Sequence, residues 1–170
     1  HVYYNDGNTS QWVNTAGAGA KGDKGELGGL LQTNSSQSNS TSGSTSISTS
    51  YTEIFNLSII PSSTNSKIAV LSSMVFDIAN TSGNLYADPA GHHKLTRTIG
   101  GTETVLVEGL CISQRDNVNA TKYQRGASSI SYLDSPNSTN TVTYKLFAKR
   151  GSNANSGSVS QSNIILMETE

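Results

Sequence analysis

Hydrophobic and polar residues alternate in short stretches from residue 51 onward, and turn-forming residues separate the stretches. This period of two predicts β-strands that bury one face. No stretch shows the period of 3.6 that predicts a helix, so the chain is expected to be all-β. The predicted strands cover residues 51–60, 67–78, 94–99, 103–107, 129–133, 142–149 and 163–167.

Two of these strands carry further information. In the strand 67–78, every second side chain is expected to face inward. The inward set is either the even-numbered residues or the odd-numbered ones between them; the even-numbered set is Ile68, Val70, Ser72, Met74 and Phe76. Gly100-Gly101 lies between two strands and predicts a two-residue hairpin turn. Seven or eight short strands separated by turns indicate an antiparallel β-sandwich or jelly roll. We assign this head to residues 46–170.

Glycine recurs at every third position in residues 16–29, at Gly19, Gly22, Gly25 and Gly28. This is the register of a collagen-type triple helix, in which only glycine fits at the axis. In a staggered trimer the lysines would lie beside carboxylates of neighbouring chains; these residues are Lys21, Lys24, Asp23 and Glu26. The alternative is a flexible linker, since the triplets contain no proline. We favour a trimeric neck, because a linker has no need for glycine at strict threes.

The remaining N-terminal residues divide into two parts. Residues 1–15 look like the end of a preceding aromatic segment, and the start at His1 suggests a piece of a longer polypeptide. Residues 30–45 form a connector rich in Ser, Thr and Asn, where Leu30-Leu31 is expected to plug the three-fold axis. The tract 34–50 would be disordered alone. Its β-branched end favours the start of the strand that continues past residue 51.

Composition and charge exclude several classes of function. The formal net charge of the 170 residues is -1 and 14% of them are charged, so nothing calls for nucleic acid or an anionic membrane. No apolar run approaches the ~20 residues of a membrane span. Cys111 is the single cysteine, which excludes a disulfide within the chain and a multi-cysteine metal site. We expect it to be a buried small hydrophobic residue.

Asp88, His92 and His93 are the one cluster with the ingredients of a metal site. On a three-fold axis, one histidine per chain would complete an octahedral site. However, adjacent residues in a strand point to opposite faces, so at most one of the two histidines would face the axis. We therefore interpret the cluster as a polar loop leading into a strand, and expect no metal and no cofactor.

Catalytic patterns are also missing from the sequence. No Gly-x-Ser-x-Gly elbow supports a Ser-His-Asp triad. The carboxylates that would have to pair for glycoside hydrolysis are scattered over turns without any spacing pattern; they are Asp77, Asp88, Asp116 and Asp134. We expect no enzymatic activity.

Several segments resemble proteins of tailed phages. Residues 2–13 (VYYNDGNTSQWV) are similar to a segment common in virion structural proteins of marine tailed phages, especially cyanophages, where it often precedes a collagen-like stretch. The head resembles a domain widespread in phage fibres, in the stretches IPSSTNSKI (60–68), YLDSP (132–136), VTYK (142–145) and IILME (164–168). The resemblance implies a trimeric virion appendage on the tail or the capsid. Residues 79–93 depart from the family pattern, so no receptor specificity is carried over.

The long connections 80–93, 114–126 and 151–161 are rich in Tyr, Ser, Asn and Gly, a composition that suits recognition. In a fibre only the loops farthest from the neck reach a host first. The contacts that we predict there are Tyr86, Tyr123 and Arg125. The alternative is that the tyrosines pack under their own loops. Arg115, Lys122 and Arg125 form a basic group, either a solvated surface or a contact for an anionic glycan.

The sequence thus leaves two hypotheses. The first is a non-enzymatic homotrimeric fibre tip on the virion surface that attaches to a host glycan or outer-membrane protein. It would join other virion proteins through a part of the polypeptide preceding residue 1. The second is a purely structural capsid or tail fibre whose head caps and trimerises the shaft.

Overall fold

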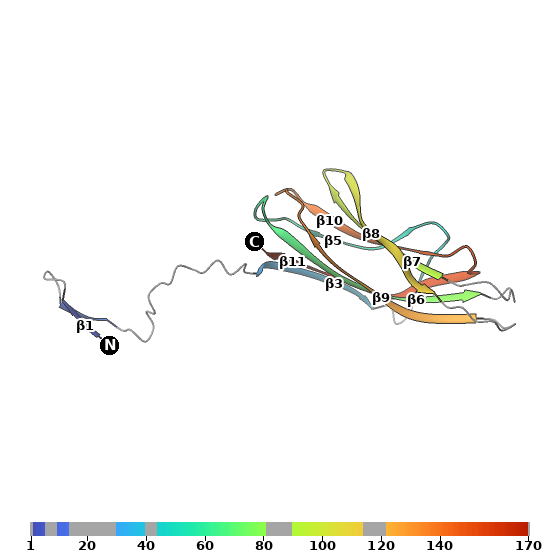
Figure 1. Cartoon of the computed structure of the whole chain (residues 1–170), viewed down its shortest axis with the longest axis horizontal. Helices are drawn as coiled ribbons and strands as arrows, with labels where there is room; N and C mark the ends of the chain where they lie inside the picture. The colour runs from blue at the N-terminus through green and yellow to red at the C-terminus, as the bar shows by residue number, and fades with distance from the viewer. Residues whose placement is uncertain are drawn as a thin grey trace.

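A computed structural model describes residues 2–5, 10–13, 30–39, 44–80, 90–113 and 122–169, and these contain strands and no helix. The strands of the head form two antiparallel sheets (Figure 1). Sheet 1 has the order β3 (Leu30–Asn39), β11 (Ser156–Thr169), β6 (Lys67–Asn80) and β9 (Lys122–Asp134), with β4 (Thr45–Ser46) also paired to β11. Sheet 2 has the order β5 (Thr52–Ile59), β10 (Val142–Arg150), β7 (Ala90–Ile99) and β8 (Thr102–Ser113).

Along its length the chain alternates between sheet 1 and sheet 2 in a defined order. From β4 onward it moves to sheet 2 at β5, to sheet 1 at β6, to sheet 2 at β7 and β8, and then alternates through β9, β10 and β11. This is the strand order of a jelly roll, in which two Greek keys cover one core. The predicted all-β fold of the head is therefore confirmed. The collagen-like neck, residues 16–29, lies outside the described residues and stays a prediction.

The core lies between the inner faces of the sheets. In β6 the set of side chains that contains Val70 is the buried one, as one of the two predicted alternatives required; Ile68, Val70 and Phe76 are 0% exposed. Because residues of a strand alternate between faces, the same alternation appears in β10, where every second residue is buried. The main core members from the other strands are Ile59, Leu95, Ile130, Val142, Tyr144, Leu146, Val159, Ile164 and Leu166.

The Gly100-Gly101 hairpin is confirmed. It joins β7 to β8, and both glycines have positive φ, 55° and 84°, as a two-residue hairpin turn requires. The strands on either side are longer than predicted. β7 begins at Ala90 and therefore includes both histidines, and β9 begins at Lys122. The outer ends of these strands carry small or polar residues on both faces, so the alternation that reveals a strand is lost there although backbone pairing continues.

The polar tract before residue 50 contributes more structure than its composition indicates. β3 was not predicted, because its Ser, Asn and Gln residues carry no hydrophobic period; it forms by pairing with β11. Ile47, the single apolar residue of the tract 34–50, is buried, and its amide donates to Gly157 O at 2.9 Å. A continuous strand from residue 45 past residue 51 is wrong. β4 belongs to sheet 1 and β5 to sheet 2, so the chain changes sheet between them.

A separate two-stranded antiparallel sheet lies within the aromatic segment 1–15. β1 (Val2–Asn5) pairs with β2 (Ser10–Val13), and Tyr3 is opposite Trp12 in the register. Neither strand is predicted by the residue pattern of this segment.

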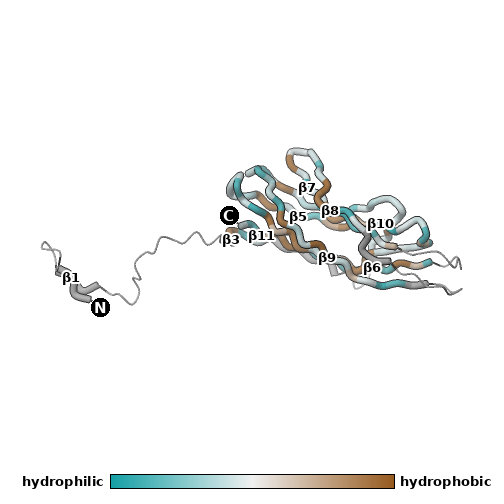
Figure 2. Tube along the Cα trace, in the orientation of Figure 1, coloured by the Kyte–Doolittle hydropathy of each residue, from teal (hydrophilic) through white to brown (hydrophobic). Residues whose placement is uncertain are grey.

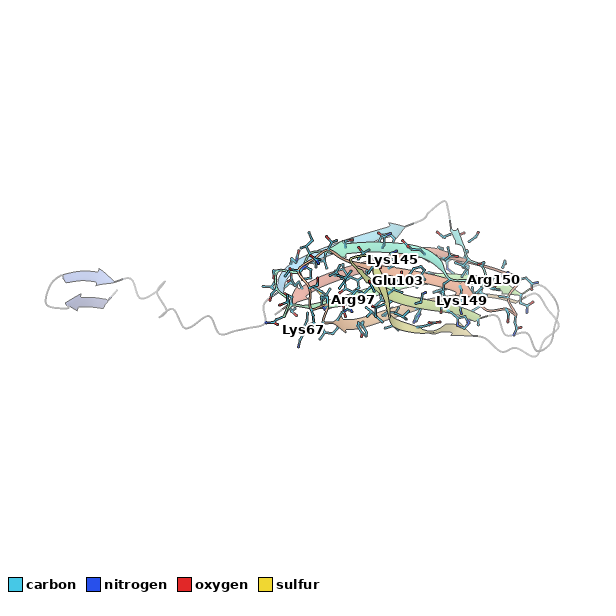
Figure 3. All side chains as sticks on the ribbon, turned by 90° about the horizontal axis from the view of Figure 1, so that it is seen from above. Lys67, Arg97, Glu103, Lys145, Lys149 and Arg150 are labelled. Atoms are coloured by element: carbon cyan, nitrogen blue, oxygen red, sulfur yellow. The ribbon has the colours of Figure 1, made fainter. Side chains whose placement is uncertain are left out.

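The head has two distinct ends. At the entry end, β3 begins at Leu30 opposite Thr169, and Figure 3 shows Lys67 and Arg97 on this side. At the far end β6 and β10 finish and β7 and β11 begin, and Figure 3 shows Lys149 and Arg150 there. The connection 151–155 and the described strand ends Asn80, Ala90, Ser113 and Lys122 lie at the far end. No helix able to cross a membrane occurs in the described part of the chain.

Candidate functional site

A cleft of about 420 Å³ lies at the far end of sheet 1. Its walls come from the end of β6, the start of β9, the start of β11 and the short strand β4. The lining residues are Ser44, Ser46, Asp77, Ile78, Ala79, Gln124, Arg125, Ser156, Gly157 and Ser158. Hydroxyl, amide, carboxylate and guanidinium groups therefore surround one space.

Asp77 and Arg125 are the two charged residues of the cleft. They are directly opposite in the register of β6 and β9, and Arg125 Nε lies 3.6 Å from Asp77 Oδ1. Their side chains are 39% and 65% exposed, so water screens the ion pair and it contributes little to stability. Both groups therefore stay accessible to a ligand.

Two further residues shape the cleft. Gln124 Oε1 is buried and accepts no hydrogen bond from any described residue; Gln124 precedes Arg125 in β9, so its side chain lies on the opposite face of the sheet. Gly157 separates the cleft from a neighbouring depression of about 360 Å³ that includes Ile47 and Arg150. A Cβ on Gly157 would come within 2.9 Å of the Ile78 side chain, so the wall fits only glycine without a shift.

Of the predicted contact residues, the structure places Arg125 in this cleft. Tyr123 is opposite Ala79 in the register of β9 and β6, but its side chain lies outside the described part, as does the whole of Tyr86. The same holds for the basic side chains of Arg115 and Lys122. All predicted neck residues are also outside the described ranges: Gly19, Gly22, Gly25, Gly28, Lys21, Asp23, Lys24 and Glu26.

A cluster of lysine and aromatic side chains, which the sequence analysis missed, lies on the outer face of sheet 2. Lys94 Nζ is 4.7 Å from the centre of the Tyr51 ring and 4.5 Å from that of Phe147. Lys149 Nζ is 4.4 Å from the Tyr51 ring. These are cation–π distances. The sequence reveals part of this cluster, because Phe147 and Lys149 are two residues apart and therefore share one face of β10. Lys94 comes beside them only through the pairing of β7 with β10, which the sequence does not reveal.

His92 and His93 do not form a metal site with other described residues. His93 is buried, and its Nδ1 is 2.7 Å from Ser128 Oγ, a contact between β7 in sheet 2 and β9 in sheet 1. Burial and the neighbouring His92 lower the pKa of His93, which keeps the ring neutral. His92 is half-buried. No group of three metal-ligating side chains occurs in the part that the structure describes, and Asp88 lies outside it.

Of the four aspartates considered for catalysis, the two that are described, Asp77 and Asp134, serve the cleft and the fold respectively. Asp134 Oδ1 accepts a hydrogen bond from Arg97 at 2.8 Å, and Asp134 Oδ2 accepts one from the Tyr144 hydroxyl at 2.7 Å. Asp77 faces Arg125, and Asp116 lies outside the described residues. His93 and Ser128 are not among the residues that line the cleft.

No protein-family model and no curated protein matches this sequence. Among solved structures, the VP2 subviral particle of infectious bursal disease virus matches at 13% identity and a TM-score of 0.44. The structure of the infectious bursal disease virus Gx strain matches at 11% identity and a TM-score of 0.42. Each match covers 81% of this chain and 33% of the other, so the chain spans about a third of those proteins. At these TM-scores the likeness carries no conclusion about function.

Proposed function

We propose that this chain forms the head of a non-enzymatic, homotrimeric virion fibre that attaches to a host-surface glycan through its far end. The observation that carries the proposal is the far-end cleft, where the side chains of Asp77 and Arg125 stay exposed.

The chemistry of the cleft suits a saccharide. Each sugar hydroxyl both donates and accepts a hydrogen bond, and the cleft offers a carboxylate acceptor, a guanidinium donor, an amide and four serine hydroxyls. A sugar carboxylate or sulfate would also pair with Arg125 in a charge-assisted hydrogen bond. Because the ion pair with Asp77 is half exposed, a ligand exchanges it at little cost.

The position of the cleft suits attachment. Residue 30 enters the head at the opposite end, and the glycine register before it supports a neck of three parallel chains. A neck that leads toward the virion leaves the far end facing the host. Three heads on a dense glycan layer gain avidity from effective concentration, so a shallow site of low affinity is sufficient.

A purely structural fibre head is the second candidate. One observation favours it: the described lining of the cleft includes no aromatic side chain, whereas ligand sites are commonly lined by aromatic residues. On this alternative the head would cap the shaft and bind no host molecule, while the trimer and its place on the virion surface would be the same.

The test uses the full 170-residue chain on an array of neutral and acidic polysaccharides and in adsorption to cells of candidate hosts. Arg125→Ala and Asp77→Ala should each weaken binding at least tenfold, and the triple change of Tyr86, Tyr123 and Arg125 to Ala should abolish it. Lys67→Ala, an exposed basic residue at the entry end, is the matched control and should leave binding unchanged.

Two outcomes count against the proposal. If the Arg125→Ala protein adsorbs as well as the unmutated protein, the cleft is not the binding site. If the unmutated chain binds no polysaccharide and no cell, the structural alternative replaces attachment.

A further inference from the structure

The outer face of sheet 1 carries an apolar patch at its entry end. Ala69 and Leu71 of β6 are flanked by Met167 and Ile165 of β11, and Leu133 of β9 is opposite Ala69. Residues directly opposite in antiparallel strands share a face, so these five side chains form one surface. We call Ala69, Leu71, Leu133, Ile165 and Met167 the entry patch. Leu71 is 37% exposed and Leu133 58% exposed.

The outer faces of the two sheets differ in charge. Along sheet 1, the rows of the entry patch and the adjoining row of Ser73, Ser129 and Asn163 contain no charged residue. The described charges of this face lie on either side of these rows, at Lys67 on the entry edge and at the far-end pair. The outer face of sheet 2 carries Lys94, Lys145 and Lys149. An outer sheet face in contact with water is normally polar. Depletion of charge together with exposed Leu is instead typical of a protein interface.

The entry patch is continuous with the place where the chain enters the head. β3 belongs to the same sheet and begins with Leu30 and Leu31, which are 59% and 42% exposed. Ile60, 60% exposed, lies beside them, because its carbonyl accepts a hydrogen bond from Gln32. Figure 2 shows hydrophobic residues at the start of β3 and along β9 and β11. The apolar surface therefore reaches the point from which the predicted neck departs.

This continuity identifies the occupant as another copy of the chain. The glycine register ends at Gly28, two residues before Leu30. Three parallel chains in that register deliver three copies of Leu30 to one axis, and each copy brings the entry end of sheet 1 with it. A surface held beside two identical neighbours at high effective concentration, and free of charge, is suited to pack against them.

We propose that the entry patch is the interface between heads of the homotrimer, with sheet 1 turned toward the three-fold axis and sheet 2 toward solvent. This inference rests on the trimer of the proposed function and names the surface that forms it. Each head contacts both neighbours, one through its Leu133 side and one through its β3 side, as a closed ring requires. The cleft at the far end of the same sheet stays beyond the apolar contact.

The test introduces a carboxylate into the patch of the full chain and measures mass by sedimentation velocity. Leu133→Glu and Leu71→Glu place a charge where the patch would be desolvated, and should shift the trimer dissociation constant at least 100-fold toward monomer. Ala127→Glu is the matched control, on the same strand and the same face but outside the patch, and should leave the trimer intact. Circular dichroism and urea unfolding check that each monomeric head is folded.

The outcomes separate this inference from the proposed function. If Leu133→Glu stays trimeric while Gly22→Val becomes monomeric, the neck alone holds the trimer and the entry patch is not an interface. If the unmutated chain is monomeric at micromolar concentration, the trimer itself is refuted, while glycan binding by the single head is tested separately. A monomeric Leu133→Glu head that keeps its affinity for a soluble oligosaccharide, and loses adsorption to cells, supports both proposals.

Discussion

Gln32 and Glu168 join the first and last long strands of the head. Gln32 Nε2 donates to Glu168 Oε2 at 2.5 Å, although the residues are 136 positions apart in the sequence. Glu168 Oε1 accepts from the Ser62 amide at 2.6 Å and from its hydroxyl at 2.7 Å. The fully buried carboxylate therefore ties together β3, β11 and the connection after β5 at the entry end.

We expect Glu168→Gln to destabilise the head. The new amide group would face the Gln32 amide or the Ser62 N–H, so one donor would oppose another and hydrogen bonds to a charge would be lost. The expected loss in the free energy of unfolding is roughly 2–3 kcal/mol, measured by urea unfolding. Glu103→Gln, at an exposed carboxylate on β8, is the control and should change it by less than ~0.5 kcal/mol. Equal stability of the two variants would contradict the role of Glu168.

Acid should remove the contribution of Glu168 in a defined pH range. Burial alone would raise the pKa of this carboxyl, but its polar surroundings, which include the hydrogen bonds from Gln32 and Ser62, lower it to about 2, from 4.5. The depressed pKa stabilises the fold fully above pH 4.5, and the stabilisation is lost as pH falls toward 2. Urea midpoints at pH 7, 4.5, 3 and 2 should therefore fall more steeply in the unmutated chain than in Glu168→Gln. Parallel curves would show that another group controls the acid response.

Ile47 is expected to anchor the serine-rich tract to the core. It is 5% exposed, and its Cγ1 lies near the backbone of Gly157, so truncation would leave a cavity beside Ile78. Ile47→Ala should lower the free energy of unfolding by roughly 2–4 kcal/mol and speed proteolysis of the tract 44–50. Val105→Ala, at a residue 51% exposed on β8, is the comparison and should have little effect. An unchanged proteolysis rate would mean that the strand pairing of β4 alone holds the tract.

Tyr144→Phe should reveal the buried network around Asp134. Burial, followed by the hydrogen bond to Asp134, raises the pKa of Tyr144 far above its usual value, so the hydroxyl stays a donor. Removal of the Tyr144 hydroxyl deletes one hydrogen bond to the Asp134 carboxylate, while the hydrogen bond from Arg97 to that carboxylate remains. The change should lower the free energy of unfolding by about 1–2 kcal/mol. Absorbance titration should also show one tyrosine of the unmutated head that ionises only on alkaline unfolding. If every tyrosine ionises before unfolding, Tyr144 is not protected as described.

Local patterns predicted the fold class and much of the core. The inward set of β6 follows from a period of two, because successive side chains of any strand point to opposite faces. The Gly100-Gly101 turn follows from the freedom of glycine to adopt positive φ. Both properties depend on a few neighbouring residues. The strand β3 was missed for the same reason, because its residues have no hydrophobic period and its partner β11 is more than a hundred positions away.

The candidate site could be predicted only in part. Composition indicated that the long connections suit recognition, and Arg125 was among the residues chosen. Its alignment with Asp77 depends on the register of β6 and β9, which no short stretch of sequence reveals. The entry patch depends in the same way on two registers, those of β6 with β11 and of β6 with β9, which bring Leu71, Ile165 and Leu133 together.

The sequence by itself therefore determined an all-β head, the inner face of its central strand and one of its turns, because strand periodicity and backbone freedom act over a few residues. The tertiary structure decided which strands are neighbours and which polar groups meet. Strand pairing and register are chosen by the packing of the whole core, since a shift of one residue would turn every buried side chain to the other face. The Gln32–Glu168 contact, the far-end cleft and the entry patch all result from that choice.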